Sequence, residues 1–361
     1  MPLSLWNKIL LFIIALPCFA LPAASAFVSI PQHRVHPKNN QIIIEATQST
    51  NNNNNQRSLL RPLFSADNSS QTTITPLPSA NTISAYSGKT VFLTGATGGL
   101  GRALALELAQ CQVAHLLLSA RKLNALEEVA KECQQLSSST LKIDLLVCDL
   151  SDPASVAATA QKALELVSKV DVLMHNGGVS SRSRFVDTAL DVDAQVMQIN
   201  FLAGAALAKA FVPGMIEAGN GKIIWISSLQ GLLGIPNRSS YAASKFAVQG
   251  YTESIRAELY SSGVTVHTVS PGYIRTNLSN AAMVGDGTNY GKTDPTTAAG
   301  ADPADVARQV LARIARGEMD FTIASTLSSV VAMVLRFFFP GLLRWLLVKR
   351  YEKSVQKDKQ D

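Results

Sequence analysis

The sequence predicts an α/β fold, a doubly wound parallel sheet in a single domain, followed by a hydrophobic helical extension at the C-terminus. Three observations lead to this prediction. Short apolar or β-branched runs alternate with helical stretches through the middle of the chain, which is typical of a parallel sheet covered by helices on both faces. A glycine-rich turn follows the first of these runs. An apolar segment interrupted by arginine and proline lies near the end of the chain.

The predicted strands are short apolar runs, as expected for strands that are buried on both faces. They cover residues 90–94, 115–119, 141–148, 170–174, 222–226 and 264–269. The predicted helices between them cover residues 100–110, 122–136, 153–168, 189–215 and 239–262. Asp302 and Pro303 predict the start of a further helix, since an acidic side chain before proline is typical of a helix N-terminus. Ligands of such sheets bind outside the carboxyl ends of the strands.

The composition indicates a packed globular domain, residues 86–325, without a nucleic-acid site. Hydrophobic residues make up 47% of the 361 residues and charged residues 16%, which excludes a globally disordered chain. The net charge of +6 lies in the tails: residues 1–85 hold 5 Lys/Arg against 2 Asp/Glu, and residues 321–361 hold 7 against 3. A nearly neutral centre argues against nucleic-acid binding. Four cysteines without a CxxC pair predict no metal site.

The first 85 residues predict a targeting sequence in two parts. Residues 1–26 contain one lysine, an apolar run and small residues at Ala24 and Ala26, as in a secretory signal peptide. Residues 27–85 are rich in Ser, Thr, Asn and Pro and cannot build a core, so we expect a disordered, transit-peptide-like segment. With Phe27 first after the cleavage site, the two parts resemble the presequence of algae with secondary plastids. The alternatives are an uncleaved membrane anchor, or a linker on a protein of the endoplasmic reticulum or endomembrane system.

Residues 326–361 form the predicted C-terminal extension. The longest stretch without a charged residue begins at Phe321 and has 15 residues, whereas a helix that spans a bilayer needs about 20. We expect a helix, a break at the Pro-Gly pair that starts at Pro340, and a second short helix ending at the basic pair 349–350. This pattern suits peripheral attachment to a membrane through residues 321–350. A subunit interface is the alternative.

The turn after the first predicted strand has the features of a dinucleotide-binding motif. Glycines allow a tight turn and let backbone N–H groups approach a pyrophosphate at the positive end of the next helix. The residues are Thr94, Gly95, Thr97, Gly98, Gly99, Leu100 and Gly101. Arg121 follows 20 residues later, where an acid would bind a ribose 2′-hydroxyl and an arginine accommodates a 2′-phosphate. The sequence therefore favours NADP(H) over NAD(H); a purely structural turn and a solvated Arg121 are the alternatives.

Tyr241 and Lys245 predict acid–base chemistry. They stand four residues apart near the start of a predicted helix, so their side chains share one face. A free tyrosine has a pKa of about 10, and a nearby cation favours the phenolate and lowers that pKa. Ser227 and Ser228 end the preceding strand. A serine hydroxyl at that place can donate a hydrogen bond to a carbonyl or to a developing alkoxide.

Together these motifs resemble the short-chain dehydrogenase/reductase family over about residues 86–325. Further positions match that family's motifs in order: Asp149 and Leu150 for the acid that contacts adenine, Asn176 and Gly177 in its Asn-Asn-Ala-Gly motif, Asn200 on a helix, and Pro271, Gly272, Ile274 and Thr276 in and after its Pro-Gly motif. The chain departs from the family at His175, which replaces asparagine, and at Gly177, which replaces alanine. We expect both departures to loosen a motif that stabilises the sheet.

The resemblance implies a Rossmann fold, bound NADP(H), a homo-oligomer, and reduction of a ketone or oxidation of a secondary alcohol. It implies that Tyr241 is the acid in reduction and the base in the reverse direction. Lys245 would lower the pKa of Tyr241 and bind the nicotinamide ribose. Ser228, 13 residues before the tyrosine, would orient the carbonyl, and Asn200 would hold a water next to Lys245. The alternative is a nucleotide-sensing scaffold without catalysis on the same fold.

A closer likeness is to the dehydrogenase/reductase member 7B branch, neighbours of the 11β-hydroxysteroid dehydrogenases. The stretches that carry it are residues 226–231, 241–245, 270–274, 276–279 and 286–291. Members of this branch are membrane-associated and carry an apolar C-terminal extension. The glycine-containing segment 277–301 predicts a mobile lid over the substrate. Apolar residues within 232–236 frame it, which favours an apolar, lipid-like small-molecule substrate.

Overall fold

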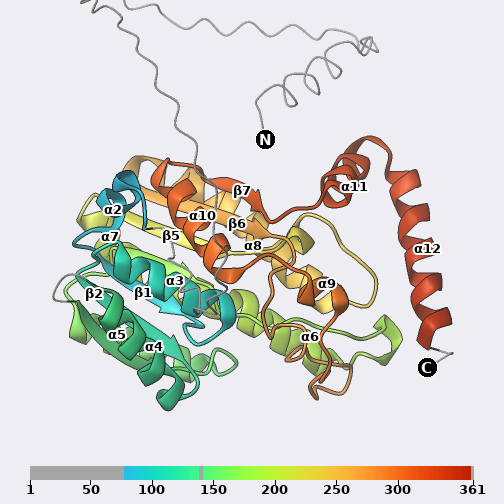
Figure 1. The fold of residues 1–361 in the computed structure, drawn as a ribbon, viewed down its shortest axis with the longest axis horizontal. Helices are drawn as coiled ribbons and strands as arrows, with labels where there is room; N and C mark the ends of the chain where they lie inside the picture. The colour runs from blue at the N-terminus through green and yellow to red at the C-terminus, as the bar shows by residue number, and fades with distance from the viewer. Residues whose placement is uncertain (1–76, 138–140, 359–361) are drawn as a thin grey trace, which may run out of the picture. The chain divides into compact units, whose positions relative to one another are not determined.

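The computed structural model describes residues 77–137 and 141–358, and its strands form one seven-stranded sheet. All neighbouring strands are parallel, in the order β3-β2-β1-β4-β5-β6-β7 (Figure 1). The strands are β1 (Thr90–Thr94), β2 (His115–Ala120), β3 (Lys142–Val147), β4 (Val172–His175), β5 (Gly221–Ile226), β6 (Val264–Pro271) and β7 (Asp320–Ile323). The predicted parallel sheet is confirmed.

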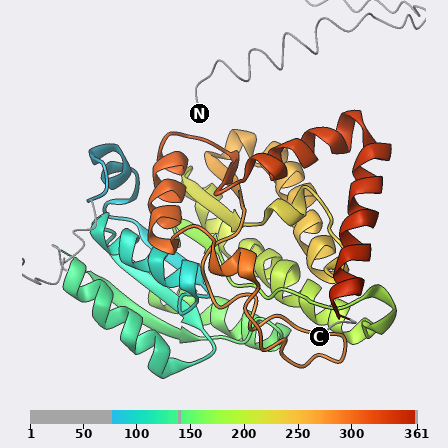
Figure 2. The ribbon, with the colours of Figure 1, turned by 45° about the vertical axis from the view of Figure 1, so that its right-hand side comes forward.

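Helices cover both faces of this sheet, and each face has its own apolar core (Figures 1 and 2). The helices are α2 (Ala80–Tyr86), α3 (Gly99–Gln110), α4 (Leu123–Leu136), α5 (Pro153–Leu166), α6 (Leu190–Met197), α7 (Ala203–Glu217), α8 (Ser239–Glu258), α9 (Pro295–Ala298), α10 (Pro303–Ala315), α11 (Leu327–Phe338) and α12 (Pro340–Asp358). Short helical turns are η1 (Phe185–Asp187), η2 (Gln198–Leu202), η3 (Leu229–Gly231) and η4 (Tyr260–Ser262). One core contains side chains of α3, α4 and α10, and the other contains side chains of α5, α7 and α8. The arrangement is therefore doubly wound, as predicted.

The order of the strands places a switch point between β1 and β4. From β1 the chain adds β2 and β3 on one side, and then returns to add β4, β5, β6 and β7 on the other. Loops after β1 and β4 therefore diverge at the carboxyl edge of the sheet, which leaves a crevice where ligands of such folds bind. The loops after β5 and β6 end at the same edge, because all the strands are parallel.

The sequence prediction was wrong at Phe321. We expected the residues from Phe321 onward to be helical, but Phe321 and Ile323 belong to β7, which pairs with β6. Aromatic and β-branched residues favour strands, and the edge of β6 offers hydrogen bonds to them. The helix begins only at α11, where the Thr326 hydroxyl accepts a hydrogen bond from the backbone N–H of Ser329.

Two further boundaries differ from the sequence predictions. The second C-terminal helix is not short, because α12 continues from Pro340 to Asp358, beyond the basic pair 349–350. The ordered domain begins before residue 86: α2 lies within the segment expected to be disordered, and its Tyr86 is fully buried. The predicted signal peptide and most of the transit-peptide-like segment lie outside the described residues.

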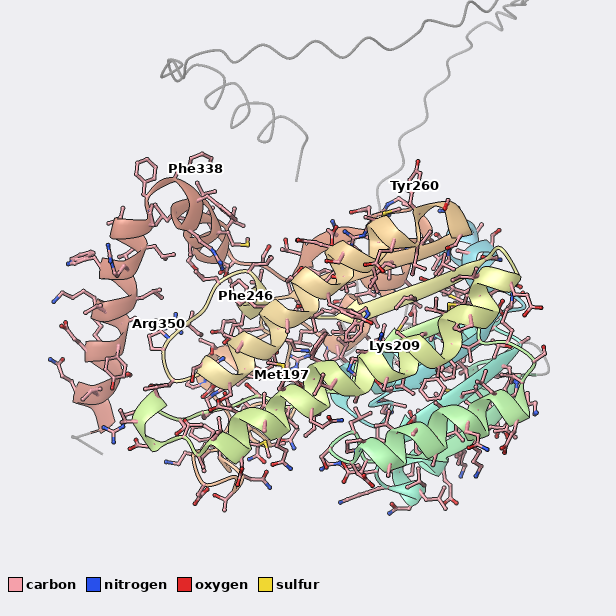
Figure 3. The ribbon with its side chains drawn as sticks, turned by 180° about the vertical axis from the view of Figure 1, so that it is seen from behind. Met197, Lys209, Phe246, Tyr260, Phe338 and Arg350 are labelled. Carbon is pink, nitrogen blue, oxygen red and sulfur yellow. The ribbon has the colours of Figure 1, made fainter. Side chains whose placement is uncertain are left out.

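The Arg336 side chain connects helix α11 to the domain. The Arg336 guanidinium donates a hydrogen bond to the Leu232 carbonyl and lies 4.4 Å from the ring centre of Phe246 on α8 (Figure 3). Within the described residues, one helical stretch, Leu190–Glu217, is long and apolar enough to cross a membrane by length and composition. Half of it is buried inside the protein, where α7 packs against α5, so it is a core helix of the domain.

Candidate active site

A cleft of about 1260 Å³ lies at the carboxyl edge of the sheet. It is lined by every residue that the sequence analysis assigned to catalysis or cofactor binding, with the exception of Thr94 and Asn200. The lining residues from that set are Gly95, Thr97, Gly98, Gly99, Leu100, Gly101, Arg121, Asp149, Leu150, Asn176, Gly177, Ser228, Tyr241, Lys245, Pro271, Gly272, Ile274 and Thr276. Positions spread over 180 residues of sequence therefore meet in one cleft.

The glycine turn is packed too closely for side chains. Gly95 has a φ of +64°, a left-handed conformation that favours glycine. A Cβ added at Gly101 would lie 2.0 Å from the Gly95 carbonyl oxygen, and one at Gly99 would lie 2.7 Å from Thr276. No side chain caps α3 at Gly98, so N–H groups of the first turn remain available at the cleft. This donor set fits a pyrophosphate.

Charged side chains line the cleft beyond the ends of β2 and β3. Arg121 and Lys122 are exposed there. The Asp149 carboxylate accepts hydrogen bonds from the Ser151 N–H at 2.9 Å and the Ser151 hydroxyl at 2.7 Å. These bonds, together with the Arg121 charge, hold the pKa of Asp149 below its usual value. Two cations beside an ionised carboxylate fit the phosphate and hydroxyl groups of an adenosine ribose.

Thr94 supports the cleft from behind instead of lining it. Its side chain is buried, and its hydroxyl oxygen accepts hydrogen bonds from the N–H groups of Asn176 at 3.1 Å and Gly177 at 2.9 Å. The Asn176 amide in turn donates to the carbonyls of Thr94 and Gly95, both at 3.2 Å. These bonds tie the turn after β1 to the turn after β4.

Both departures from the family motif lie at this connection, and the expectation that they loosen it stays a prediction. The His175 ring, through Nδ1, is hydrogen-bonded to the Thr94 hydroxyl at 3.1 Å, and the ring packs edge-on against Trp225. A Cβ at Gly177 would lie 2.4 Å from Leu150, so alanine would not fit there without a shift of its neighbours.

Tyr241 and Lys245 lie on one face of α8, both almost completely buried. The ammonium nitrogen of Lys245 lies 5.8 Å from the centre of the Tyr241 ring and donates a hydrogen bond to the Ile226 carbonyl at 2.9 Å. Burial lowers the pKa of Lys245 to about 8. The Ser228 side chain follows β5 and accepts a hydrogen bond from the Gln230 N–H at 3.1 Å.

The groups that lower the pKa of Tyr241 are not the ones that the sequence indicated. Burial is the largest influence and raises the pKa of Tyr241 above its usual value of 10. A hydrogen bond with Ser228 and the positive charges of Arg238 and Arg182 act in the opposite direction. The Lys245 ammonium group lies over the Tyr241 ring and donates to the Ile226 carbonyl, and its effect on the pKa of Tyr241 stays a prediction.

Asn200 lies in a π-helical turn, η2, between α6 and α7. Its side chain is completely buried: the amide oxygen accepts from the Val179 N–H at 2.8 Å, and the amide nitrogen donates to the Val179 carbonyl at 2.9 Å and the Ser244 hydroxyl at 2.8 Å. Asn200 thereby fixes the loop after β4 to the helix that carries Tyr241. Such π-turns often mark functional sites.

Sequence reasoning did not find several other residues of this cleft. Arg182, Arg238 and Tyr273 line it near Tyr241, and Ser329 and Met333 of α11 line it from the C-terminal extension. The only local signal for any of them is that Arg238 precedes Tyr241 by three residues, almost one helical turn.

The sequence profile of the family named short chain dehydrogenase matches residues 89–284, more than half of the chain. The protein belongs to the short-chain dehydrogenase family. Membership makes it one of a family of oxidoreductases, in agreement with the resemblance seen in the sequence.

Individual members of the short-chain dehydrogenase family agree with this assignment. The chain is 42% identical to a dehydrogenase/reductase SDR family protein 7-like of *Anopheles gambiae*, over 74% of this chain and 84% of the relative. It is 41% identical to dehydrogenase/reductase SDR family member 7B of *Bos taurus*, over 73% of this chain and 82% of the relative. The predicted likeness to the 7B branch is confirmed.

Solved structures of short-chain dehydrogenases share the fold. A *Burkholderia phymatum* enzyme in complex with NAD superposes with a TM-score of 0.62 at 25% identity, over 72% of this chain and 96% of that one. A metagenomic short-chain oxidoreductase in complex with NADP superposes with a TM-score of 0.53 at 28% identity, over 67% and 97%. Since one carries NAD and the other NADP, these structures do not decide between the two nucleotides.

Proposed function

We propose that the protein is an NADPH-dependent reductase of ketones, or in reverse an NADP-dependent dehydrogenase of secondary alcohols, with an apolar and lipid-like substrate. The observation that carries this proposal is the meeting of Ser228, Tyr241 and Lys245 with the glycine turn in a single cleft. Arg121 and Lys122 at the end of β2 favour NADP(H), because they supply positive charge where a 2′-phosphate would bind. The turn after β1 would hold the pyrophosphate.

The bound nicotinamide supplies the hydride, and the protein supplies placement and proton transfer. Tyr241 donates its phenolic proton to the carbonyl oxygen in reduction and takes it back in oxidation. The Ser228 hydroxyl, whose interaction with Tyr241 lowers the pKa of the phenol, orients that oxygen. Lys245 would bind the nicotinamide ribose. Asn200, the fourth member of the set, keeps the loop after β4 in place beside Lys245.

The other lining positions complete the proposed cofactor site. Asp149 and Leu150 would contact the adenine end, and Asn176 and Gly177 the middle of the nucleotide. The segment after β6 would contact the nicotinamide end through Pro271, Gly272, Ile274 and Thr276, all of which line the cleft.

Apolar side chains near Tyr241 support an apolar substrate. Leu229, Leu233 and Ile235 line the cleft after β5, Met283 lines it from the segment 276–301, which contains the predicted lid 277–301, and Met333 lines it from α11. The C-terminal extension therefore forms part of the substrate wall. An apolar wall on several sides excludes water from a buried phenol, and this favours hydrophobic carbonyl compounds over small polar ones.

We propose a membrane surface as the partner of the C-terminal extension. Helices α11 and α12 expose the apolar side chains of Leu327, Val331, Val334, Phe337, Phe338, Phe339, Leu342, Trp345, Leu346 and Val348. Arg344, Lys349 and Arg350 on α12 add positive charge. Apolar contact combined with basic residues is typical of helices that lie in a membrane interface. A homo-oligomer that covers the same face is the competing proposal.

Nucleotide binding is the experiment that tests the proposed function. Residues 77–358 would be titrated with NADPH and NADH while the nicotinamide fluorescence is followed. We expect NADPH to bind more tightly, and Arg121→Asp to reverse the preference by tenfold or more in the ratio of dissociation constants, about 1.4 kcal/mol. Lys162→Asp makes the same change of charge on α5, outside the cleft lining, and is expected to leave the ratio unchanged.

The results of this titration, together with a screen for turnover, distinguish a reductase from a nucleotide-sensing scaffold without catalysis. Tight binding would be followed by a screen of carbonyl compounds with Tyr241→Phe as the blank, and turnover that this substitution abolishes would support a reductase. Binding without turnover of any carbonyl would favour a nucleotide-sensing scaffold. If the folded domain bound neither nucleotide, this result would contradict both the reductase and the nucleotide-sensing scaffold.

A further inference from the structure

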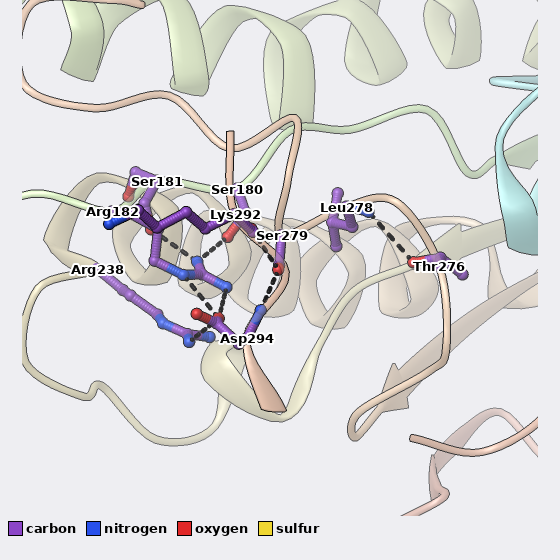
Figure 4. Close-up of polar contacts among 9 residues, drawn as sticks. All are labelled: Ser180, Ser181, Arg182, Arg238, Thr276, Leu278, Ser279, Lys292 and Asp294. Atoms are coloured by element: carbon purple, nitrogen blue, oxygen red, sulfur yellow. Dashed lines mark hydrogen bonds and ion pairs between the residues drawn. The ribbon is translucent and has the colours of Figure 1, made fainter. Parts of the chain in front are cut away.

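Two arginines and one carboxylate form a buried cluster in the cleft (Figure 4), and the charges of both arginines lower the pKa of Tyr241. The Nε and Nη2 atoms of Arg182 donate to Oδ2 of Asp294 at 3.0 and 2.6 Å, and Nη2 of Arg238 donates to the same oxygen at 3.0 Å. The side chains of Arg182, Arg238 and Asp294 are only 9%, 11% and 17% exposed. Two guanidinium groups share one carboxylate, so the cluster keeps one net positive charge.

The carboxylate comes from the segment 276–301, which lines the cleft. Asp294 stands at the N-terminus of α9, but its side chain does not cap that helix. Its backbone N–H donates to the Ser279 hydroxyl at 2.8 Å, and this hydroxyl donates to the Lys292 carbonyl at 3.2 Å. The segment is therefore folded on itself around Asp294, and it directs the carboxylate at the two arginines instead of at its own helix.

Arg182 is connected to the backbone of Tyr241. Its Nη1 donates to the Ser180 hydroxyl at 2.6 Å and to the Ser181 carbonyl at 2.8 Å. The Ser181 hydroxyl accepts a hydrogen bond from the Tyr241 N–H at 3.2 Å. The loop after β4 also pairs with the segment 276–301, since the Arg182 N–H donates to the Met283 carbonyl at 2.8 Å.

Arg238 belongs to the N-terminus of the helix that carries Tyr241. It is the residue before α8, and its carbonyl accepts the N–H of Ala242 at 2.8 Å. Arg182 and Arg238 both line the cleft. The loop after β4, the start of α8 and the segment 276–301 are thus joined at one carboxylate oxygen, in the cleft that Tyr241 also lines.

We propose that Arg182 and Arg238 are positioning residues that hold the Tyr241 phenol in a positively charged environment, and that Asp294 is the latch through which the segment 276–301 fixes both. Closure of this segment then does two things at once. It covers the substrate side of the cleft, and it sets the charge beside Tyr241 to two cations and one anion. The proposal rests on the proposed role of Tyr241, but its test below requires no turnover.

The charges around Tyr241 determine whether each substitution should raise or lower the pKa of its phenol. The charged and titratable groups that face it are Lys245 and Arg238 on α8 or at its start, Arg182 after β4, Tyr273 after β6, Asp294 of the segment 276–301, and Arg350 of α12 at the rim of the cleft. Arg238 and Arg182 lower the pKa of Tyr241, against the larger effect of burial. Removal of either guanidinium should therefore raise this pKa, whereas neutralisation of Asp294 should lower it.

The test is a spectroscopic titration of the Tyr241 phenolate in the full chain. Ultraviolet absorbance is recorded after rapid pH jumps, before the protein unfolds, and each variant is made with and without Tyr241→Phe so that the difference isolates Tyr241. We expect Arg238→Met to raise the midpoint by about one pH unit and Asp294→Asn to lower it by a similar amount. Arg238→Lys should return the midpoint towards that of the unmodified protein, because it restores the charge.

Controls separate this effect from a general loosening of the site. Arg182→Met is expected to act in the same direction as Arg238→Met, and it serves if the latter does not fold. Arg275→Met breaks an exposed pair with Asp302 at 2.7 Å, close to the same segment in sequence, and should leave the midpoint unchanged. Opposite shifts in Asp294→Asn and Arg238→Met would support the proposed arrangement of two cations and one anion beside Tyr241. Superimposable titrations, or shifts of one sign in both variants, would refute this arrangement.

Discussion

Two buried histidines make the stability of the domain depend on pH. His175 at the end of β4 and His267 in β6 are 1% and 2% exposed. Burial is the main cause that lowers their pKa, to about 3 for His175 and about 4 for His267. Both rings stay neutral in the folded protein at pH values where an unfolded chain, with a histidine pKa of about 6.5, takes up protons. Stability is therefore lost as the pH falls below 6.5 towards these lower values.

The first prediction concerns His175→Asn, which places the asparagine of the family motif at this position. The free energy of unfolding of the unmodified domain should decrease by about 2 kcal/mol per buried histidine between pH 7 and pH 5. In the variant, the decrease in the free energy of unfolding between pH 7 and pH 5 should therefore be smaller by about 2 kcal/mol, whatever its stability at pH 7. Urea unfolding at the two pH values measures this difference, and His267→Gln provides a parallel test. An unchanged loss in both variants would contradict the prediction.

The sequence alone could identify those site residues that lie close together along the chain. Tyr241 and Lys245 are separated by one helical turn, and the glycines surround one tight turn, so both patterns are visible along the chain. Arg182 and Arg238 donate to the Asp294 carboxylate, from which they are separated by 112 and 56 residues of sequence, respectively. No local pattern indicates such a pair, since only the folding of the segment 276–301 brings Asp294 to it.

At the scale of elements, the sequence predicted strands and helices correctly where the apolar pattern alone decides them. Six of the seven strands and the main helices lie close to the predicted ranges. The prediction failed at β7, where a charge-free stretch was interpreted as one helix. A stretch of uniform hydrophobicity does not show where a strand ends and a helix begins. That boundary is set by the free edge of β6 and by the Thr326 cap of α11.

The C-terminal helices give a second prediction at this scale. Phe338 is 50% exposed on α11, and Tyr260 is 87% exposed on η4, away from the extension (Figure 3). If α11 and α12 lie in a membrane interface, Phe338→Asp should weaken binding to vesicles tenfold or more, because burial of a phenylalanine contributes about 1.5–3 kcal/mol. Tyr260→Asp introduces the same charge at an exposed aromatic residue and should have no comparable effect.

Co-sedimentation with vesicles of mixed zwitterionic and anionic phospholipid measures this binding. Equal binding by the Phe338 and Tyr260 variants would contradict a membrane role for the face. A protein that does not sediment with vesicles but forms a dimer, which Phe338→Asp dissociates, would show that a second subunit covers the face instead.

At the scale of the whole molecule, charge separates the tails from the domain. The central region carries almost equal numbers of acidic and basic residues, while both tails are basic. The sheet and the glycine turn lie mainly in the central region, while the C-terminal tail adds most of β7 and part of the cleft wall. We propose that residues 1–85 direct the chain to a plastid surrounded by additional membranes, and that the C-terminal helices then bring the cleft to a lipid surface where an apolar substrate is available.

The proposed subcellular location can be tested separately from the enzymatic activity. Residues 1–85 fused to a fluorescent protein should accumulate in the plastid when expressed in an alga with a secondary plastid. Phe27→Ala should stop the fusion before the plastid, because the aromatic residue at the predicted junction is the feature that distinguishes this presequence from a plain signal peptide. Phe64→Ala changes the same residue type within the same segment and should not alter the destination. Retention of the unmodified fusion in the endoplasmic reticulum would contradict plastid import and would favour the endomembrane alternative, in which the same basic, apolar C-terminal helices would face that membrane.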